Sequence, residues 1–166
     1  MRSVVVFAVA AIAIALFVPK LYSAGAPAAP PAALADPGDD RAAGPRSVTI
    51  RQGVNGHFQT EATIEGTRIA FMVDTGASVV ALREGDAARL GIHPAEGDYT
   101  ARISTANGMV KAARVALSRV DVGDISVRDV TAVVLPDAAL GQNLLGMSFL
   151  SRTRWAQQNG RLVLEQ

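Results

Sequence analysis

The chain of 166 residues contains no cysteine, only two histidines and few aromatic residues. Without cysteine it can form neither a disulfide nor a thiolate metal site, and it has no thiol nucleophile. The two histidines, His57 and His93, are far apart and lack the spacing of metal ligands, so each is interpreted as a surface or strand residue. We therefore expect no metal and no organic cofactor.

Neither sign of charge is in excess. The formal net charge is +1, and from Ser47 onward twelve Lys and Arg face twelve Asp and Glu. Nucleic-acid-binding domains normally carry a clear excess of basic residues, so nucleic acid is not expected as a partner. The sequence also lacks a Gly-rich phosphate loop and a G-x-S-x-G elbow, and no histidine is near Ser78, which argues against a serine nucleophile.

One long hydrophobic run is present, at the N-terminus. Residues 4–18 are all apolar, and only Met1, Arg2 and Ser3 precede them. A helix over residues 3–22 would be about 30 Å long, enough to cross the hydrocarbon core of a bilayer. The run fits a signal peptide or an uncleaved signal anchor. Because no clean small-x-small cleavage site follows, we favour a transmembrane anchor over residues 1–22, with the rest of the chain exported.

The rest of the chain divides by composition. Six of the eight prolines lie before residue 46, and residues 23–46 are rich in alanine and proline, which predicts a flexible linker. Residues 47–166 are then left for one folded domain, a usual domain size. Short β-prone runs fill it. Turn signals separate these runs at Asn55–Gly56, Glu65–Gly66, Ala106–Gly108 and Gly123–Asp124, and the first of these is a strong hairpin signal.

Two short helices are expected among these strands. Residues 83–91 place Ala87, Leu90 and Ile92 on one apolar side, with Gly91 as a C-terminal stop. A second helix follows Gly146, and its apolar residues are interpreted as core. Residues 160–166 predict a last strand. The pattern indicates a mostly β domain that closes as a small barrel or sandwich.

The segment FMVDTGASVVAL, residues 71–82, contains the residue that most needs an explanation. A carboxylate inside an apolar run is costly to bury unless it is hydrogen-bonded, paired or protonated. Asp74 is therefore either a stabilised core residue or a working acid. Gly76 lets the backbone turn tightly beside the carboxylate and offers it an amide, and the Thr75 hydroxyl can brace the loop against a second copy.

Four segments, FMVDTGAS, STANG, VDVGDI and NLLGMSFLSR, occur in this order along the chain. Together they resemble the bacterial retropepsin-like aspartic proteases, single-domain relatives of the retroviral proteases that are often carried on a membrane anchor. A bare Asp-Thr-Gly is a weak signal, but adding Leu144-Leu145-Gly146 about seventy residues later makes the match specific. The resemblance covers residues 53–164.

The resemblance implies a retropepsin-like closed β-barrel, half of the pepsin architecture. It assigns the catalytic role to Asp74, with Thr75 and Gly76 in the same loop. It also implies that the hairpin formed by Thr105, Ala106, Asn107 and Gly108 is a flap over a bound peptide, although an ordinary surface hairpin remains an alternative. Leu144-Leu145-Gly146 would pack beneath the catalytic loop.

The mechanism of the family needs two such aspartates, and this chain supplies one. No other aspartate stands in an apolar-Asp-Thr/Ser-Gly context. We therefore expect a homodimer with one Asp74 from each chain, acting on an exported or membrane polypeptide. The expected location is the bacterial inner membrane, with the protease domain in the periplasm. The alternatives are a catalytically inactive peptide-binding module and a domain that only assembles envelope complexes.

Overall fold

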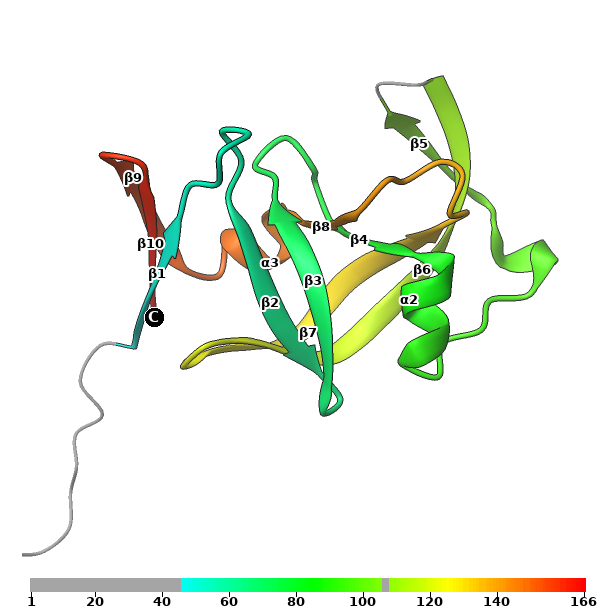
Figure 1. Cartoon of the computed structure of the whole chain (residues 1–166). Helices are drawn as coiled ribbons and strands as arrows, with labels where there is room; N and C mark the ends of the chain where they lie inside the picture. Colours follow the sequence, from blue (N-terminus) through cyan, green and yellow to red (C-terminus); the bar gives the residue numbers. More distant parts are fainter. Residues whose placement is uncertain (1–45, 106–107) are drawn as a thin grey trace, which may run out of the picture. The chain divides into compact units, whose positions relative to one another are not determined.

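The computed structural model describes residues 46–105 and 108–166, and this part of the chain is mostly β-structure (Figure 1). It contains two short α-helices, α2 (Glu84–Arg89) and α3 (Met147–Leu150), and one turn of 3₁₀-helix, η1 (Glu96–Asp98). The strands are β1 (Ser47–Arg51), β2 (Gln59–Ile64), β3 (Thr67–Val73), β4 (Val80–Arg83), β5 (Ala101–Thr105), β6 (Gly108–Val122), β7 (Ile125–Leu135), β8 (Asn143–Leu145), β9 (Arg154–Gln158) and β10 (Arg161–Glu165).

Six of these strands close into a barrel. Their order is β2-β3-β8-β4-β7-β6, and β6 returns to β2 by pairing Thr63 with Asp121 and Ile64 with Val120. Most neighbours are antiparallel, but β8 runs parallel to β3 and β4 runs parallel to β7. Each of the six strands has two hydrogen-bonded neighbours, so the prediction of a mostly β, closed barrel with two short helices is confirmed.

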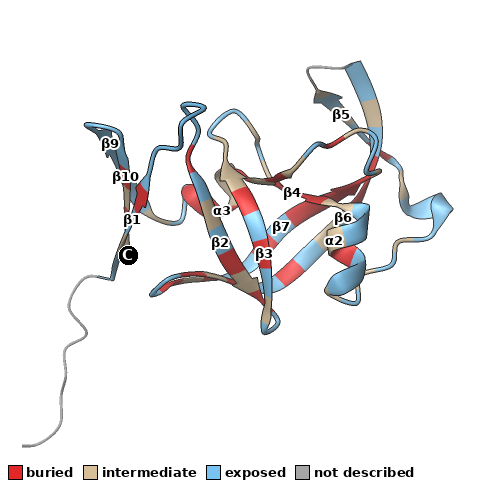
Figure 2. Cartoon of the chain, viewed as in Figure 1, coloured by how far each residue is buried: buried red, intermediate tan, exposed pale blue. Residues whose placement is uncertain are grey.

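The barrel encloses an apolar core because inward-facing and outward-facing residues alternate along its strands. In β3, the buried Ile69 and Phe71 alternate with the exposed Arg68 and Ala70 (Figure 2). Burying one such large apolar side chain contributes about 1.5–3 kcal/mol. Helix α3 adds the buried Phe149 to the same core, as the sequence predicted.

Three of the predicted hairpins are present. Strand β2 joins β3 through Glu65–Gly66, and β6 joins β7 through Gly123–Asp124. Strand β5 pairs only with the first part of β6, so this hairpin extends from the barrel (Figure 1). Its turn, residues 106–107, lies outside the described residues.

The hairpin predicted at Asn55–Gly56 is wrong for most of its length. The chain does turn there, but β1 pairs with β10, and only an isolated bridge from Gln52 to Phe58 links the two sides of the turn. Pairing with β10 places Ile50 opposite Leu162, and both side chains are buried. Strand β2 already has two partners, β3 and β6, so burial decides the pairing over the turn signal.

Helix α2 lies inside the predicted segment 83–91 and ends where the sequence indicated. Gly91 has a φ of 73°, its N–H donates to the Ala88 carbonyl at 3.0 Å, and the Ile92 N–H donates to the Ala87 carbonyl at 3.0 Å. These two bonds form a Schellman C-cap, which needs a residue with positive φ at this position.

Three strands were not predicted from the sequence. Strands β4 and β8 have only four and three residues, too few for a periodic pattern. Strand β9 pairs with β10 across a turn at Asn159–Gly160, so a hairpin signal was present but was not recognised. All five residues of β9 are exposed, so it lacks the alternation typical of a strand with one buried face.

Within residues 46–105 and 108–166, no helix has the length and apolar character needed to span a membrane. The predicted anchor over residues 1–22 and most of the predicted linker, residues 23–45, lie outside the described residues. These boundaries therefore stay predictions.

Candidate active site

Asp74 follows directly on β3 at the barrel wall. Its backbone N–H donates to the Leu145 carbonyl at 3.1 Å, which continues the parallel pairing of β3 with β8 beyond the end of the strand. The Gly76 N–H donates to Asp74 Oδ1 at 2.8 Å, and the Ala77 N–H donates to the Asp74 carbonyl at 3.3 Å. The half-buried carboxylate is therefore held by an amide of its own loop.

Gly146 packs directly against this loop. A Cβ atom at Gly146 would lie 2.2 Å from the Val79 carbonyl oxygen and 2.7 Å from the Ala77 carbonyl oxygen. The next residue, Met147, donates its N–H to the Ala77 carbonyl at 2.8 Å. The apolar-apolar-Gly element thus lies against the Asp74 loop, and only a residue without a side chain fits between the two carbonyls.

Ser148 ties the far end of the loop to the barrel. Its Oγ accepts the Val80 N–H at 2.9 Å and donates to the Thr131 carbonyl at 2.7 Å. One hydroxyl therefore joins β4 and β7 at the start of α3. The loop that carries Asp74 is anchored at both ends by side chains or backbone of the segment 145–148.

A pocket of about 600 Å³ lies beside Asp74. Its other lining residues are mostly apolar and come from the Asp74 loop, from β3, β4, β5, β7 and β8, and from the segment before β8. They are Met72, Gly76, Ala77, Ser78, Val79, Ala81, Arg102, Ile103, Ser104, Thr105, Val133, Leu135, Ala139, Leu140 and Leu144. Asp74 is the only carboxylate among the described residues that line this pocket, so it faces a largely apolar space.

One residue of the predicted flap, Thr105, lines this pocket. Strand β5 contributes four residues, including Thr105, to the pocket wall. The Thr105 hydroxyl donates to the Gly108 carbonyl at 2.9 Å, which closes the described end of the hairpin, and Gly108 itself does not line the pocket. Ala106 and Asn107 lie outside the described residues, so their part in a flap stays a prediction.

The remaining predicted residues are placed as follows. Thr75 is exposed at the tip of the loop, and Gly76 donates its amide to Asp74 as described. Among the described residues, no three His, Cys, Asp or Glu side chains come close enough together to hold a metal ion. His57 and His93 are both exposed.

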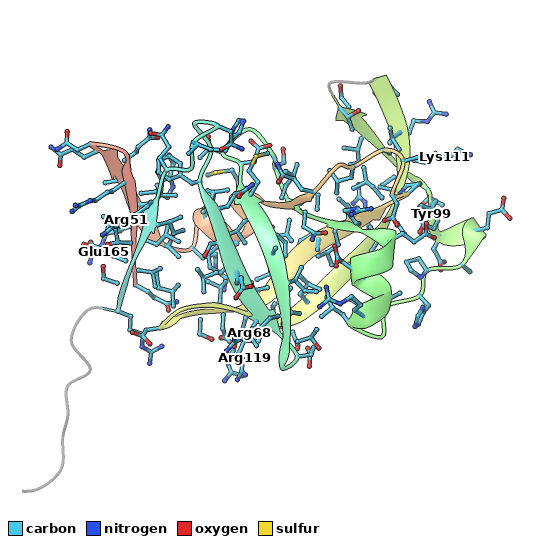
Figure 3. All side chains as sticks on the ribbon, viewed as in Figure 1. Arg51, Arg68, Tyr99, Lys111, Arg119 and Glu165 are labelled. Carbon is cyan, nitrogen blue, oxygen red and sulfur yellow. The ribbon has the colours of Figure 1, made fainter. Side chains whose placement is uncertain are left out.

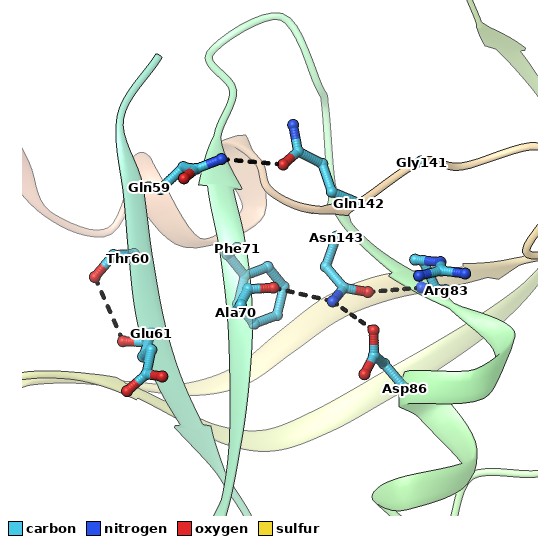
Figure 4. Close-up of a pocket in the computed structure, with 10 residues that line it drawn as sticks. All are labelled: Gln59, Thr60, Glu61, Ala70, Phe71, Arg83, Asp86, Gly141, Gln142 and Asn143. Atoms are coloured by element: carbon cyan, nitrogen blue, oxygen red, sulfur yellow. Dashed lines mark hydrogen bonds between the residues drawn. The ribbon is translucent and has the colours of Figure 1, made fainter. Parts of the chain in front are cut away.

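A second pocket, of about 480 Å³, lies beside β2 and β3 and was not foreseen from the sequence (Figure 4). It is lined by Gln59, Thr60, Glu61, Ala70, Phe71, Arg83, Asp86, Gly141, Gln142 and Asn143. Gln142 connects the two pockets, because it accepts a hydrogen bond from Gln59 at 3.3 Å and donates one to Met72 Sδ at 2.9 Å.

One charged group of this second pocket, Asp86, is paired with its neighbours. Asp86 Oδ1 accepts a hydrogen bond from Arg89 at 2.8 Å, and Oδ2 accepts one from Asn143 at 2.9 Å. Burial alone would raise the pKa of Asp86, but these hydrogen bonds and the charges of Arg89 and Arg83 outweigh it and lower the pKa below its usual value. Asp86 is thus held in its ionised form.

Comparisons with known proteins agree with this geometry. The family described as "gag-polyprotein putative aspartyl protease" matches residues 60–152, more than half of the chain. The crystal structure of a retropepsin-like aspartic protease from Rickettsia conorii superimposes with a TM-score of 0.65 at 36% sequence identity, covering 73% of this chain and 91% of that chain.

Two curated proteins are also similar, and both are uncharacterised. One, from the cobV 5′ region of a Sinorhizobium species, is 42% identical over 114 residues, covering 69% of this chain and 49% of that protein. The other, from Rickettsia prowazekii, is 40% identical over 105 residues, covering 63% of this chain and 45% of that protein. The chain therefore spans about half the length of the curated relatives it matches. From the family match and the structural similarity, which confirm the resemblance seen in the motifs, we conclude that this chain belongs to the bacterial retropepsin-like aspartic protease family.

Proposed function

We propose that this protein is an aspartic endopeptidase in which Asp74 activates a water molecule for attack on a peptide bond. The observation that carries the proposal is the Asp74 carboxylate, fixed by the Gly76 amide at 2.8 Å and placed at the wall of a 600 Å³ pocket. An apolar pocket beside a single carboxylate suits a polypeptide with apolar side chains near the cleaved bond.

The proposed mechanism uses two copies of Asp74 around one water. One carboxylate takes a proton from the water as it attacks the carbonyl carbon, and the other, protonated, donates a hydrogen bond to the developing oxyanion. Two carboxyl groups about 3 Å apart cannot both ionise easily, so the pair shares one proton. Thr75 and Gly76 would shape the loop, and residues 105–108 would cover the peptide.

Because Asp74 is the only carboxylate among the described residues that line its pocket, we propose that the active form is a homodimer with a two-fold axis through the site. Strand β9 supports this proposal. Its outer edge has no strand partner within the described residues, all five of its residues are exposed, and Trp155 remains 42% exposed. An exposed edge strand with few charges readily pairs with another strand.

We further propose that the domain is held in the bacterial inner membrane by residues 1–22 and acts in the periplasm on an exported or membrane protein. The support is the apolar run over residues 4–18 and the Pro-rich segment after it. Confinement of copies to a membrane would raise their effective concentration and favour dimers.

The test is peptide cleavage by the full chain in detergent, with a mixed peptide library as substrate. We expect Asp74→Asn to lower kcat by about 10³-fold, since acid–base catalysis contributes roughly 10²–10⁴-fold. Asp124→Asn, at an exposed turn, is the matched control and should keep full activity. The rate should rise more steeply than linearly with protein concentration in the dilute range, where half-sites must first meet.

Two outcomes would contradict the proposal. Full activity in Asp74→Asn would assign the reaction to another group. Retention of peptides by the wild type and by Asp74→Asn, without cleavage by either, would indicate a binding module.

A further inference from the structure

Asn143 is the only polar residue that is buried among the described residues, with 3% of its surface exposed. It begins β8 and does not line the pocket of Asp74. A buried amide is costly unless its hydrogen bonds are made, so its partners indicate what it does.

The side chain of Asn143 joins three elements (Figure 4). Its Oδ1 accepts the Arg83 N–H at 2.8 Å, where β4 ends, and its Nδ2 donates to the Ala70 carbonyl of β3 at 2.9 Å. The second N–H of Nδ2 donates to Asp86 Oδ2 of α2 at 2.9 Å. Both amide hydrogens and the amide oxygen are therefore used.

These bonds replace a strand ladder that is too short. Strand β8 lies between β3 and β4, but it pairs with β4 only through Leu144 opposite Ala81. Beyond this bridge, the Asn143 side chain takes the place of backbone pairing with β4, and it adds a bond to β3, with which β8 pairs along its whole length. Asp86 fixes which way the amide group of Asn143 is turned. An ionised carboxylate can accept a hydrogen bond from the NH₂ group but cannot donate one to the amide oxygen.

The position of β8 determines the position of Asp74. Leu145, two residues after Asn143, accepts the Asp74 N–H at 3.1 Å, and Leu144 lines the pocket beside Asp74. A displacement at the start of β8 is therefore transmitted to the catalytic carboxylate by one hydrogen bond. Misplacement of a reacting group by about 1 Å can cost 10²-fold in rate.

We propose that Asn143 and Asp86 are positioning residues that set the position of the Asp74 loop through β8. The inference rests on the proposed function for its effect on catalysis, but its structural part concerns the bond between Asp74 and Leu145 alone. Neither residue touches the substrate pocket, so both act through Asp74.

Asn143→Asp separates positioning from simple loss of stability. It replaces the amide with a carboxylate that faces the ionised Asp86, and two facing carboxylates repel unless they share a proton. At acid pH a shared proton restores one hydrogen bond between residues 143 and 86. Asn143→Leu cannot regain this hydrogen bond at any pH, because its side chain has no polar group.

The experiment uses the full chain and compares wild type, Asn143→Asp, Asn143→Leu and Gln59→Ala. Gln59→Ala is the control, because it removes a hydrogen bond of the same pocket without touching Asn143. We measure kcat and KM from pH 3.5 to 7.5, and the amide hydrogen exchange of Asp74, with the amides of β6 and β7 as internal references for global unfolding.

We expect Asn143→Asp to lower kcat about 100-fold near pH 7 but less than about fivefold near pH 4, with KM changed less than about threefold. Exchange at the Asp74 amide should rise at least about tenfold near pH 7 while the β6 and β7 references stay protected. Asn143→Leu should keep both defects at all pH values, and Gln59→Ala should match the wild type.

An unchanged Asp74 exchange rate in Asn143→Asp would overturn the inference, as would a kcat ratio to wild type that does not depend on pH. If the wild type cleaves no peptide, the proposed function fails, and the exchange measurement still decides whether Asn143 positions Asp74.

Discussion

The barrel and the three-stranded terminal sheet of this chain differ in how completely their strands are paired. The barrel closes on itself when β2 pairs with β6, so its six strands have no open edge. The sheet β1-β10-β9 buries one side, through Ile50, Leu162 and Leu164, but ends on β9, whose residues are all exposed (Figure 2). The charged side chains Arg51 and Glu165 project from this sheet (Figure 3).

The same difference exists in the chemistry. The barrel holds Asp74 through two hydrogen bonds: the Gly76 amide donates to its carboxylate, and its own backbone N–H donates to the Leu145 carbonyl. It provides no second carboxylate within the described pocket. In the proposed dimer, the closed barrel would hold one of the two carboxylates, and the open sheet edge would offer a surface for the second copy.

The largest loss of barrel stability is expected when a side chain is added at Gly146. In Gly146→Ala, the new Cβ would lie 2.2 Å from the Val79 carbonyl oxygen, so backbone must move. We expect a loss of at least about 2 kcal/mol in the free energy of unfolding, measured with urea, since overpacking costs roughly 1–3 kcal/mol or more. Gly141→Ala is the matched control, because nothing lies within 4 Å of its Cβ position. Equal stability of both variants would contradict the close packing.

Trp155→Lys tests the open edge of the terminal sheet. A lysine on an edge strand opposes pairing with a second strand, so we expect the dissociation constant of the dimer to rise about tenfold. Sedimentation over a range of concentrations measures this change. Val54→Lys is the control, since it also introduces a lysine at a fully exposed apolar residue, but outside β9. An unchanged dissociation constant in Trp155→Lys would place the interface elsewhere.

The barrel was largely predictable from the sequence, because local signals agree with it. The Glu65–Gly66 and Gly123–Asp124 turns, the helix stop at Gly91 and the apolar residues after Gly146 all occupy the predicted places. The position of Asp74 at the end of β3 could also be predicted, because strand, aspartate and turn are adjacent in the chain.

The terminal sheet and the Asn143 network could not be predicted in this way. Strand β1 pairs with a strand more than a hundred residues away, and a turn signal at Asn55–Gly56 says nothing about such a partner. Asn143 is an ordinary polar residue in the sequence, and only the fold brings it next to Arg83 and Asp86. Tertiary pairing overrides local preference at these points.

Asp86→Asn tests a smaller contribution to the stability of the barrel. Because hydrogen bonds and nearby arginines lower the pKa of Asp86, its ionised form stabilises the folded state above the ordinary carboxyl pKa of 3.8, and this contribution is lost as the pH falls through the lowered pKa. We expect Asp86→Asn to lower the free energy of unfolding by about 1 kcal/mol at pH 7. The difference from wild type should shrink in urea titrations below about pH 3.8. A difference that is constant with pH would contradict the role of the charge.

The smallest effect is expected at Tyr99, where η1 leads into the β5–β6 hairpin (Figure 3). The Tyr99 hydroxyl donates to Glu84 Oε1 at 3.1 Å, and burial, this bond and nearby carboxylates raise the pKa of the phenol. The bond therefore stabilises the folded state below the ordinary pKa of 10.0, and its contribution is lost as the pH rises through the raised pKa.

We expect Tyr99→Phe to cost about 0.5 kcal/mol at pH 7, because the bond is exposed to solvent. A double-mutant cycle with Glu84→Gln isolates this contribution from other effects of each substitution. Coupling between the two substitutions at pH 7 would show that the hairpin base is tied to α2 by this bond. Strict additivity would mean that this bond does not hold the hairpin to α2, so that the hairpin is held by β6 and by the apolar packing of Ala101 and Ile103 against the barrel.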